Sequence, residues 1–453
     1  MSQTTIAAIA TALGEGGIGT VRISGPDAIK IADAVFISAS GKKIADIKGY
    51  TALFGKIKYQ KGQPSDAVAL KFCAPKSYTG EDTVELSVHG GRLLMRQTLR
   101  AVLDSGAVLA APGEFTKRAF LNGTIDLTEA ESVMGLISAR NESELRMASA
   151  AHIGLVSDKI TSIEQILLDA AASIAVYSDY PEEYIPELGD DLFLQKLSGV
   201  KNVLDELLST YDSGRILREG IDTAIVGKPN VGKSTLMNHL SGVARSIVTE
   251  IAGTTRDIIE DTVTVGDFTL RLADTAGIHA TADTVESVGV NLALDRIKTA
   301  DLVLAVFDGS CMPSDDDIRL VSLIDKKPCI AIVNKSDCKI YDYSQILKDL
   351  PTVTLSAKTG SGTKDLEEKI AEVVGVTAFD PDSAVLLNER QRAAAKTAAD
   401  ALSEAIDTLK SGFTIDAVGI CVDDALNALA TLTGKRVTTA VADEIFKKFC
   451  VGK

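Results

Sequence analysis

The chain has 453 residues, of which 45% are hydrophobic and 24% charged, the balance of a globular protein. Its length exceeds what one ordinary hydrophobic core accommodates, so two to four domains are expected. Its formal net charge of −15 argues against a protein that grips nucleic acid without a basic partner, because contacts with phosphates dominate that affinity. The six cysteines lie far apart and form no CxxC pair, which argues against a disulfide framework or a zinc knuckle.

The N-terminal sequence MSQTTIAAIA lacks the basic region and the cleavage site of a signal peptide, so we expect a cytoplasmic protein. The most apolar segment, ILLDAAASIAVY, spans residues 166–177 and is interrupted by Asp169. It is too short to cross a bilayer, and we interpret it as a buried helix.

Three sequence patterns predict a multidomain protein. Residues 1–120 mix short alternating strands with glycine-rich turns, which is typical of an α+β module. Residues 121–217 and 376–453 read as an all-α helical domain, and the segment DLTE predicts a capping box between Asp126 and Glu129. Residues 218–375 alternate strand, loop and helix, which predicts a Ras-like P-loop α/β G domain inserted into the helical domain.

The segment TAIVGKPNVGKST carries the most specific signal in the chain. Directly after an apolar strand and before a helical pattern, it fits G-x-x-x-x-G-K-[ST] through Gly227, Gly232, Lys233 and Ser234. The glycines allow backbone N–H groups to surround phosphates, and Lys233 reaches the outer phosphates. The Ser234 hydroxyl is placed to bind Mg²⁺. We therefore predict a nucleoside triphosphate site here.

Two later segments supply the parts that sense the γ-phosphate. AGTTRD contains Thr254 and Thr255, and in such a switch segment a threonine can complete the Mg²⁺ shell. LRLADTAG is an apolar strand that ends at Asp274, which is expected to hold the metal through water. Gly277 then offers a backbone N–H to the γ-phosphate.

Two further segments predict guanine as the base. The strand CIAIVNKSD ends in Asn334, Lys335 and Asp337, whose carboxylate can accept from guanine's N1–H and 2-amino groups. Adenine lacks this donor pair, and LSAK is placed to contact the base. We assign GTP binding to Asn230, Val231, Gly232, Lys233, Ser234, Thr235, Thr249, Glu250, Ile251, Ala252, Gly253, Thr254, Thr255, Asp274, Thr275, Ala276, Gly277, Asn334, Lys335, Asp337, Ser356, Ala357 and Lys358.

Residue 278 departs from the pattern of many small GTPases, which place a glutamine there to orient the attacking water. Ile278 cannot hydrogen-bond water, so hydrolysis must be organised by another group. The nearby candidates are His279, Asp283 and Glu286, and solvated loop positions are an equally good description of all three.

Several smaller features have structural interpretations. GEGGIG formally satisfies G-x-G-x-x-G but leads into a strand, so we interpret it as a glycine-rich turn and not a dinucleotide motif. His89 is interpreted as a turn residue, and SDDD (Ser314 to Asp317) as a solvated loop or helix start. The cysteines other than the last one are expected in the core.

The C-terminal sequence EIFKKFCVGK leaves Cys450 with four readings: lipidation signal, metal ligand, reactive thiol or structural residue. CVGK lacks the lipidation pattern, and no partner ligands accompany the cysteine. Two helices are predicted with TGKR between them, the second ending at Phe449, and a helix C-terminus does not activate a thiol. The residues alone therefore favour an inert thiol.

A combination of motifs identifies a family. The chain contains GKPNVGKS, VTEIAGTTRD, DTAG with Glu286, NKSD and terminal FCVGK, together with GGIGTVRISG, SYTGEDTVELSVHGG and PGEFTKRAFLNGTIDL. Over its full length it resembles the MnmE (TrmE) tRNA-modification GTPases. The resemblance implies a homodimer that associates through the N-terminal modules. It also implies a flavin-dependent partner, MnmG, with which C5 of the wobble uridine of certain tRNAs receives an aminomethyl or carboxymethylaminomethyl group.

The resemblance further implies metal and catalytic residues. The family's K⁺ ligands match Asn230, Thr249, Ile251 and Thr254, and its Mg²⁺ ligands match Ser234 and Thr255. A K⁺ between the α- and γ-phosphates can neutralise charge as an arginine finger does elsewhere. Glu286 matches the family's water-positioning carboxylate, which acts through an intervening water.

In the family the N-terminal module holds a reduced folate, which supplies the one-carbon unit as 5,10-methylene- or 5-formyl-tetrahydrofolate. The matching positions are Arg22, Glu85, Thr124 and Lys453, and Thr124 stands where the family usually has a lysine. An arginine can pair with the glutamate-tail carboxylates, and a carboxylate can accept donors of the pterin ring. Cys450 matches a residue needed for modification but not for GTP hydrolysis, so the tail is expected to join a second active site.

The alternative is a ribosome-assembly or translation GTPase, a binding switch without modification chemistry that shares this subtype of G domain. Such proteins usually carry basic RNA-binding modules. Here the flanking segments are acidic helices and a folate-like module, which favours the tRNA-modification reading.

Overall fold

The computed structural model describes residues 4–12, 14–60, 62–179, 190–245, 261–272, 297, 300–324, 327–377 and 379–452. Residue contacts divide the chain into two compact units. The first comprises Met1–Met134, Ser157–Leu197 and Asp400–Lys453, and the second comprises Gly135–Val156 and Ser198–Ala399. The domain limits expected from the sequence, at residues 120, 217 and 375, stay a prediction.

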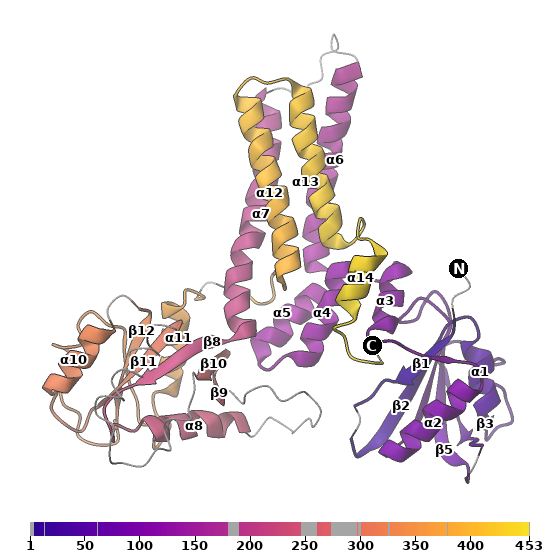
Figure 1. Cartoon of the computed structure of the whole chain (residues 1–453), viewed down its shortest axis with the longest axis horizontal. Helices are drawn as coiled ribbons and strands as arrows, with labels where there is room; N and C mark the ends of the chain where they lie inside the picture. The colour runs from indigo at the N-terminus through magenta and orange to yellow at the C-terminus, as the bar shows by residue number, and fades with distance from the viewer. Residues whose placement is uncertain are drawn as a thin grey trace. The chain divides into compact units, whose positions relative to one another are not determined.

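The N-terminal part of the first unit is a seven-stranded sheet with the order β3-β4-β5-β6-β2-β1-β7 (Figure 1). Only β1 and β7 pair in parallel among these described strands. The helices α1 (Ala28–Val35) and α2 (Arg92–Asp104) bury their apolar faces in the same core cluster as the strands. The strands are β1 (Ile6–Ile9), β2 (Gly16–Ser24), β3 (Phe36–Ser38), β4 (Thr51–Ile57), β5 (Ser65–Phe72), β6 (Thr83–Gly90) and β7 (Val108–Leu109).

The glycine-rich segment GEGGIG is part of a strand and not only a turn, because β2 already begins at Gly16. A Cβ atom on Gly19 would lie 2.3 Å from Met95 Sδ of α2, so only glycine allows the strand to approach this helix. The ladder between β2 and β6 shifts register between Gly16 and Gly19. Close packing and a bulge therefore explain the glycines.

Besides α1 and α2, the first unit contains α3 (Glu114–Leu121), most of α4 (Leu127–Ser138) and of α6 (Leu155–Asp179), and α13 (Ile415–Thr433) and α14 (Thr439–Phe446). The helices α6 and α13 lie side by side (Figure 1), where Ile174 of α6 packs on Gly419 of α13. The last helix ends at Phe446 and not at Phe449 as expected. After Phe446 the chain forms a tighter turn, in which the Phe449 N–H donates to the Phe446 carbonyl three residues earlier.

By length and composition alone, α6 is one helix of the described residues that could cross a membrane. It is also the helix that contains the apolar segment 166–177. Its fully buried residues recur at helical spacing, at Ile160, Ile163, Leu167, Ala170 and Ile174. The buried Glu164 carboxylate pairs with Lys435. One buried stripe along a helix is typical of a helix packed against other helices.

The capping box predicted at the start of α4 is confirmed. Asp126 Oδ1 accepts the Glu129 N–H at 2.9 Å, and Glu129 Oε2 accepts the Asp126 N–H at 2.7 Å. The second Asp126 oxygen accepts the Ser157 hydroxyl of α6 at 2.5 Å. One carboxylate therefore caps α4 and also joins it to α6.

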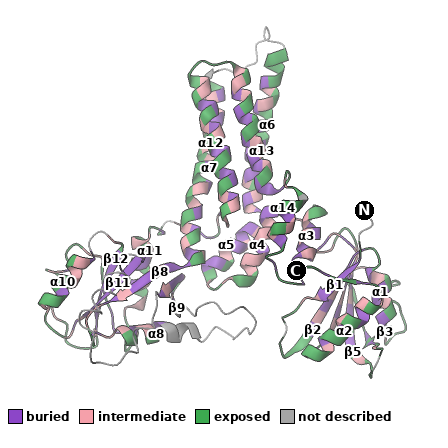
Figure 2. Cartoon of the chain, viewed as in Figure 1, coloured by how far each residue is buried: buried purple, intermediate pink, exposed green. Residues whose placement is uncertain are grey.

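The second unit contains a six-stranded sheet with the order β13-β12-β11-β8-β10-β9, in which β9 alone among the described strands is antiparallel to its neighbour. Figure 2 shows β11 and β12 as buried strands, and every residue of β12 is buried. The strands are β8 (Ile221–Val226), β9 (Asp261–Val265), β10 (Phe268–Leu272), β11 (Leu302–Asp308), β12 (Cys329–Asn334) and β13 (Thr352–Thr354). The predicted fold class, an α+β module, a helical part and a P-loop α/β domain, is confirmed.

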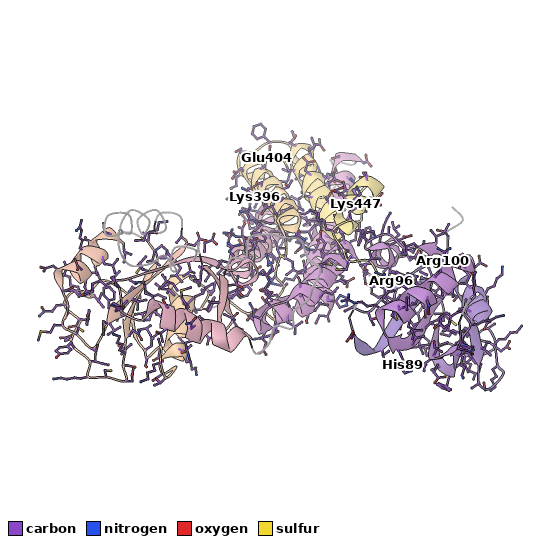
Figure 3. All side chains as sticks on the ribbon, turned by 60° about the horizontal axis from the view of Figure 1, so that its bottom comes forward. His89, Arg96, Arg100, Lys396, Glu404 and Lys447 are labelled. Atoms are coloured by element: carbon purple, nitrogen blue, oxygen red, sulfur yellow. The ribbon has the colours of Figure 1, made fainter. Side chains whose placement is uncertain are left out.

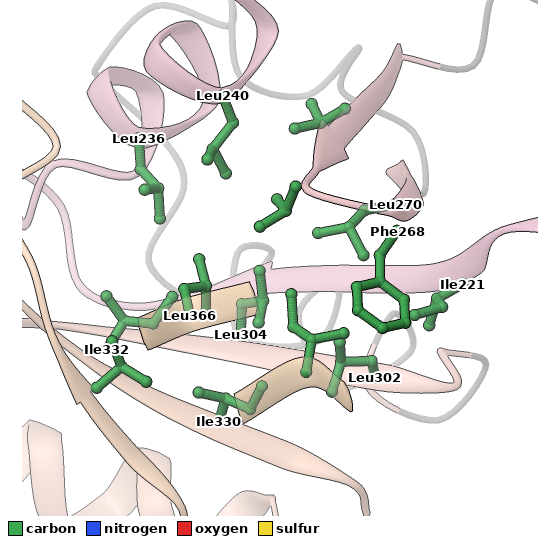
Figure 4. Close-up of a cluster of buried hydrophobic side chains, with 14 of the residues drawn as sticks. Ile221, Leu236, Leu240, Phe268, Leu270, Leu302, Leu304, Ile330, Ile332 and Leu366 are labelled. Carbon is green, nitrogen blue, oxygen red and sulfur yellow. The ribbon is translucent and has the colours of Figure 1, made fainter. Parts of the chain in front are cut away.

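The helices of the second unit are α5 (Glu142–His152), α8 (Lys233–Arg245), α10 (Asp315–Leu323), α11 (Thr363–Val373), most of α7 (Asp190–Glu219) and half of α12 (Glu389–Lys410). Two hydrophobic clusters contain residues of this sheet. For the larger one, Figure 4 shows Leu236 of α8 and Leu366 of α11 facing the strands. Met147 of α5, Leu217 of α7 and Val385 belong to the same cluster. The core of the α/β domain thus includes side chains from helices that precede it and from the loop that follows it.

We expect Asp126→Ala to lower the free energy of unfolding by about 1–2 kcal/mol, because α4 loses its N-cap and its bond to Ser157. Urea unfolding followed by circular dichroism measures the change. The matched control is Asp158→Ala, which removes an exposed carboxylate from the first turn of α6. Equal stability of the two variants would contradict the role of the cap.

Candidate functional site

The P-loop lies between the end of β8 at Val226 and the start of α8 at Lys233. Its glycines Gly227 and Gly232 have φ angles of 152° and 99°, which residues with side chains rarely adopt. A Cβ atom would lie 2.4 Å from the Val306 carbonyl oxygen at Gly227, and 2.2 Å from Asn334 Nδ2 at Gly232. The loop is therefore pressed onto β11 and β12, and both glycines are required.

The side chains expected to contact phosphates and cations lie together on this loop. Lys233 Nζ donates to the carbonyl oxygens of Gly227 and Lys228, both at 2.7 Å, and burial lowers the pKa of Lys233. Asn230, which has a left-handed φ of 66°, is exposed, and so is Ser234 at the start of α8. A helix N-terminus with free N–H groups beside a lysine fits a polyphosphate.

Asn334 connects the P-loop to the segment expected to contact the base. Its Nδ2 donates to the Val231 carbonyl at 2.8 Å, and its Oδ1 accepts the Ala357 N–H at 2.9 Å. The residue is 2% exposed, so these bonds are protected from water. The structure thus brings GKPNVGKS, NKSD and LSAK together, although they are far apart in the sequence.

Asp337, which is expected to contact the base, is held by a neighbouring hydroxyl. Its Oδ1 accepts the hydroxyl of Ser356 at 2.6 Å, and this bond lowers the pKa of the Asp337 carboxyl. Ser356 is buried and Lys358 is exposed. An ionised carboxylate with one oxygen fixed can accept two parallel donors, as the guanine edge requires.

Lys335, the second residue of NKSD, pairs with an acidic residue that the sequence patterns did not single out. Its Nζ lies 2.5 Å from Asp308 Oδ2, and its backbone has a left-handed φ of 68°. Burial of Asp308 opposes ionisation, but bonds from Lys335 and Ser310 hold the pKa of Asp308 below its usual value. The pair fixes the lysine stem beside the expected position of the base.

Part of the expected site lies outside the described residues. This applies to Thr249, Glu250, Ile251, Ala252, Gly253, Thr254, Thr255, Asp274, Thr275, Ala276, Gly277, Ile278, His279, Asp283, Glu286 and Lys453. The described hairpin of β9 and β10 begins at Asp261, after the segment that contains Thr255, and ends at Leu272, before Asp274.

A second polar cluster lies in the N-terminal module. Arg22 Nε donates to Glu85 Oε1 at 2.9 Å across the paired strands β2 and β6, and the side chains are 17% and 23% exposed. The Arg22 guanidinium lies over the rings of Tyr78 and Phe115, 5.2 and 5.6 Å from their centres. Two of the four expected folate residues are thus in contact. Tyr78 and Phe115 were missed, because only the fold brings them to Arg22.

These residues fit a carboxylate-bearing ligand. Among the described contacts Arg22 uses Nε for Glu85, which leaves its two terminal nitrogens available for a ligand carboxylate. Burial raises the pKa of Tyr78, whose hydroxyl bonds with that of Thr116 at 2.8 Å. Thr124 donates its hydroxyl to the Ala119 carbonyl at 2.8 Å, so it closes α3 and carries no charge to a ligand.

The C-terminal tail is attached to the same module. The Cys450 carbonyl accepts the Gly113 N–H at 3.2 Å, two residues before Phe115. Gly452 has a φ of 96°, and a Cβ atom there would lie 2.2 Å from the Ile9 carbonyl oxygen. The Cys450 side chain is exposed. The tail therefore packs closely on β1 and presents its thiol to solvent.

Other residues weighed in the sequence have mixed outcomes. His89 is an exposed residue of β6, one position before the strand ends at Gly90 (Figure 3), so its interpretation as a turn residue is wrong. The expectation that the cysteines before the last lie in the core is wrong for Cys311 and Cys338, which are exposed in loops beside β11 and β12, and Cys73 is only half-buried. Cys329 is buried, and burial raises its pKa to about 12.

A P-loop between a buried strand and a helix, joined through Asn334 to an Asn-Lys-x-Asp segment, defines a GTP-binding protein of the G-domain class. Two family models match the chain: "MnmE helical domain" over residues 127–450 and "GTP-binding protein TrmE N-terminus" over residues 5–124. The chain belongs to the MnmE family of tRNA modification GTPases, as its motifs predicted.

Curated relatives match along the entire chain. The tRNA modification GTPase MnmE of Carboxydothermus hydrogenoformans is 40% identical over 463 residues, which is 100% of both chains. The relative of the same name from Alkaliphilus oremlandii is 39% identical over 99% of both chains. The one from Bacillus velezensis is 39% identical over 99% of this chain and 100% of its own.

We expect Asn334→Ala to lower the free energy of unfolding by about 2–3 kcal/mol, because the Val231 carbonyl and the Ala357 N–H lose their buried partner. Affinity for GDP should fall with it, since the P-loop and the base segment are no longer joined. Calorimetric unfolding and GDP titration measure both effects. Asn238→Ala on the exposed face of α8 is the matched control, and a variant at Asn334 that behaves like it would refute this role.

Proposed function

We propose that this protein is a K⁺-dependent GTPase that acts with a flavoprotein partner, MnmG, on tRNA. Its product is the aminomethyl or carboxymethylaminomethyl form of the wobble uridine, substituted at C5 with a one-carbon unit from tetrahydrofolate. Family membership supports this proposal, because the matched relatives are named tRNA modification GTPases. The observation that carries the GTPase part is the bond pair of Asn334, which assembles the phosphate loop and the guanine segment in one place.

GTP hydrolysis is assigned to residues of the G domain. Lys233 exchanges its loop carbonyls for phosphate oxygens, and Asp337 selects guanine. When bound, Mg²⁺ and K⁺ would supply charge neutralisation, the first at Ser234 and Thr255, and the second at Asn230, Thr249, Ile251 and Thr254. Glu286 positions the attacking water through a second water, because Ile278 cannot do so.

Modification chemistry is assigned to the N-terminal module and the C-terminal tail. Arg22 and Glu85 bind the folate with Lys453, and Thr124 contributes no charge where the family usually has a lysine. Cys450 serves the modification step and not the hydrolysis step. The exposed thiol and the tail's attachment near Phe115 support this assignment.

The assembly we propose is a homodimer through the N-terminal modules, bound to MnmG in the cytoplasm. The net charge of −15 supports a basic partner surface that helps to hold the tRNA. Loss of the modified wobble uridine in cells that lack this gene, measured by mass analysis of tRNA nucleosides, tests the proposed function. An unchanged nucleoside profile would favour the translation or ribosome-assembly alternative.

Replacing K⁺ by Na⁺ should reduce GTP turnover by about 10-fold or more while GDP affinity stays nearly constant. The reason is that a K⁺ ligated by Asn230 would stabilise charge that develops in the transition state. Phosphate release in matched chloride salts measures the rate, and nucleotide titration measures the affinity. Equal turnover in both salts would remove the assignment of Asn230 to K⁺.

Cys450→Ser should abolish tRNA modification, because a hydroxyl is a far weaker nucleophile than a thiol. GTP turnover should stay at the wild-type level. Nucleoside analysis of tRNA and phosphate release measure the two activities. The control is Cys73→Ser, a half-buried cysteine of the same unit. Loss of both activities, or of neither, would return Cys450 to a structural role.

A further inference from the structure

The P-loop contains a second lysine, Lys228, whose partner comes from a distant segment. Its Nζ lies 2.7 Å from Asp317 Oδ2 and 2.7 Å from the Ser314 hydroxyl. Lys228 occupies a variable position of the phosphate-loop pattern, whereas Ser314 and Asp317 begin α10. The sequence interpretation of SDDD as a solvated helix start is therefore correct for the helix and wrong for Asp317, which is 1% exposed.

The buried carboxylate of Asp317 accepts three hydrogen bonds at one oxygen, Oδ2. Besides Lys228 it accepts the Ser314 N–H and the Ser314 hydroxyl, both at 2.9 Å. A buried ion pair gives little net stability, since an apolar pair of the same size is often as stable. What such a pair does provide is a fixed distance between two segments, here the phosphate loop and the start of α10.

The position of this pair in the loop gives it a functional consequence. The ion pair holds the Lys228 side chain on one side, and on the other side the carbonyl of Val231 accepts Asn334 Nδ2 at 2.8 Å. The loop is thus anchored on both sides of Pro229 and Asn230, which are exposed. Asn230 has a left-handed backbone, whose conformational cost the surrounding structure must offset.

We infer that Lys228, Ser314 and Asp317 form a positioning clamp, which holds the phosphate loop in the shape that receives the nucleotide and the cation at Asn230. The inference rests on the proposed GTP site and adds to it a segment that belongs to none of the GTPase motifs. The clamp residues touch neither nucleotide nor metal, so they act through the loop backbone.

Without the clamp, the loop occupies its binding shape for a smaller fraction of the time, and apparent affinity falls by that fraction. We expect GDP to dissociate about 10-fold faster, the scale of one charge-assisted hydrogen bond. The K⁺ concentration for half-maximal turnover should rise several-fold, because Asn230 lies between the anchors. Turnover at saturating GTP and K⁺ should change less than twofold.

The decisive variant is Lys228→Met combined with Asp317→Asn, which removes both charges and leaves no unpaired buried ion. Lys228→Arg as a single substitution keeps a cation opposite Asp317. It should leave the rate of GDP dissociation and the K⁺ dependence near those of the wild type. The matched control is Lys369→Met with Glu372→Gln, which removes a 2.6 Å ion pair from the surface of α11 in the same unit. Stopped-flow fluorescence with N-methylanthraniloyl-GDP measures dissociation in the full-length chain.

The outcomes separate three cases. Faster dissociation and a raised K⁺ requirement, with a wild-type unfolding temperature, support the clamp. Wild-type dissociation and K⁺ dependence in the folded double variant would overturn it. If the double variant unfolds, Asp317→Asn alone provides the same comparison, and wild-type kinetics there would also overturn the clamp. If the wild-type chain itself fails to bind GDP, the proposed GTP site falls instead.

Discussion

The nucleotide site depends on one buried amide. Asn334 donates from Nδ2 to one loop and accepts at Oδ1 from another, and both bonds lie in a region closed to water. Because a buried amide is costly when either bond is missing, the two loops are held to one relative position. The absence of a side chain at Gly232 is part of the same constraint, since a Cβ there would occupy the place of the amide.

The two candidate sites use different means to hold a charged group still. In the phosphate loop, lysines are held by carbonyl oxygens and by a buried carboxylate, so the backbone is shaped before a ligand arrives. In the N-terminal module, the Arg22 guanidinium is placed by two aromatic rings and a cross-strand carboxylate. The first arrangement presents N–H groups to an anion, and the second presents a flat donor surface to a carboxylate.

The sequence predicts those features that depend on residues close together in the chain. The phosphate loop, the strand that ends in NKSD, and the Asp126–Glu129 cap all have fixed spacing, and each is found where expected. The partners of Lys228 and Arg22 could not be predicted, because only the fold brings Asp317, Tyr78 and Phe115 to them. Its charge alone predicted that SDDD is exposed to solvent. The sequence does not reveal that Lys228 pairs with Asp317, one of the carboxylates of this segment.

The shared core at the base of the α/β domain limits how modular this insertion is. Met147, Leu217 and Val385 lie outside or at the edge of residues 218–375 in sequence, yet they belong to the cluster that covers the sheet. A fragment cut at those limits would carry an uncovered apolar patch and would tend to self-associate. A G domain from another protein could replace this one on the same helices only if its apolar surface fitted theirs. The G domain and the helical segments that pack on it are therefore expected to evolve together.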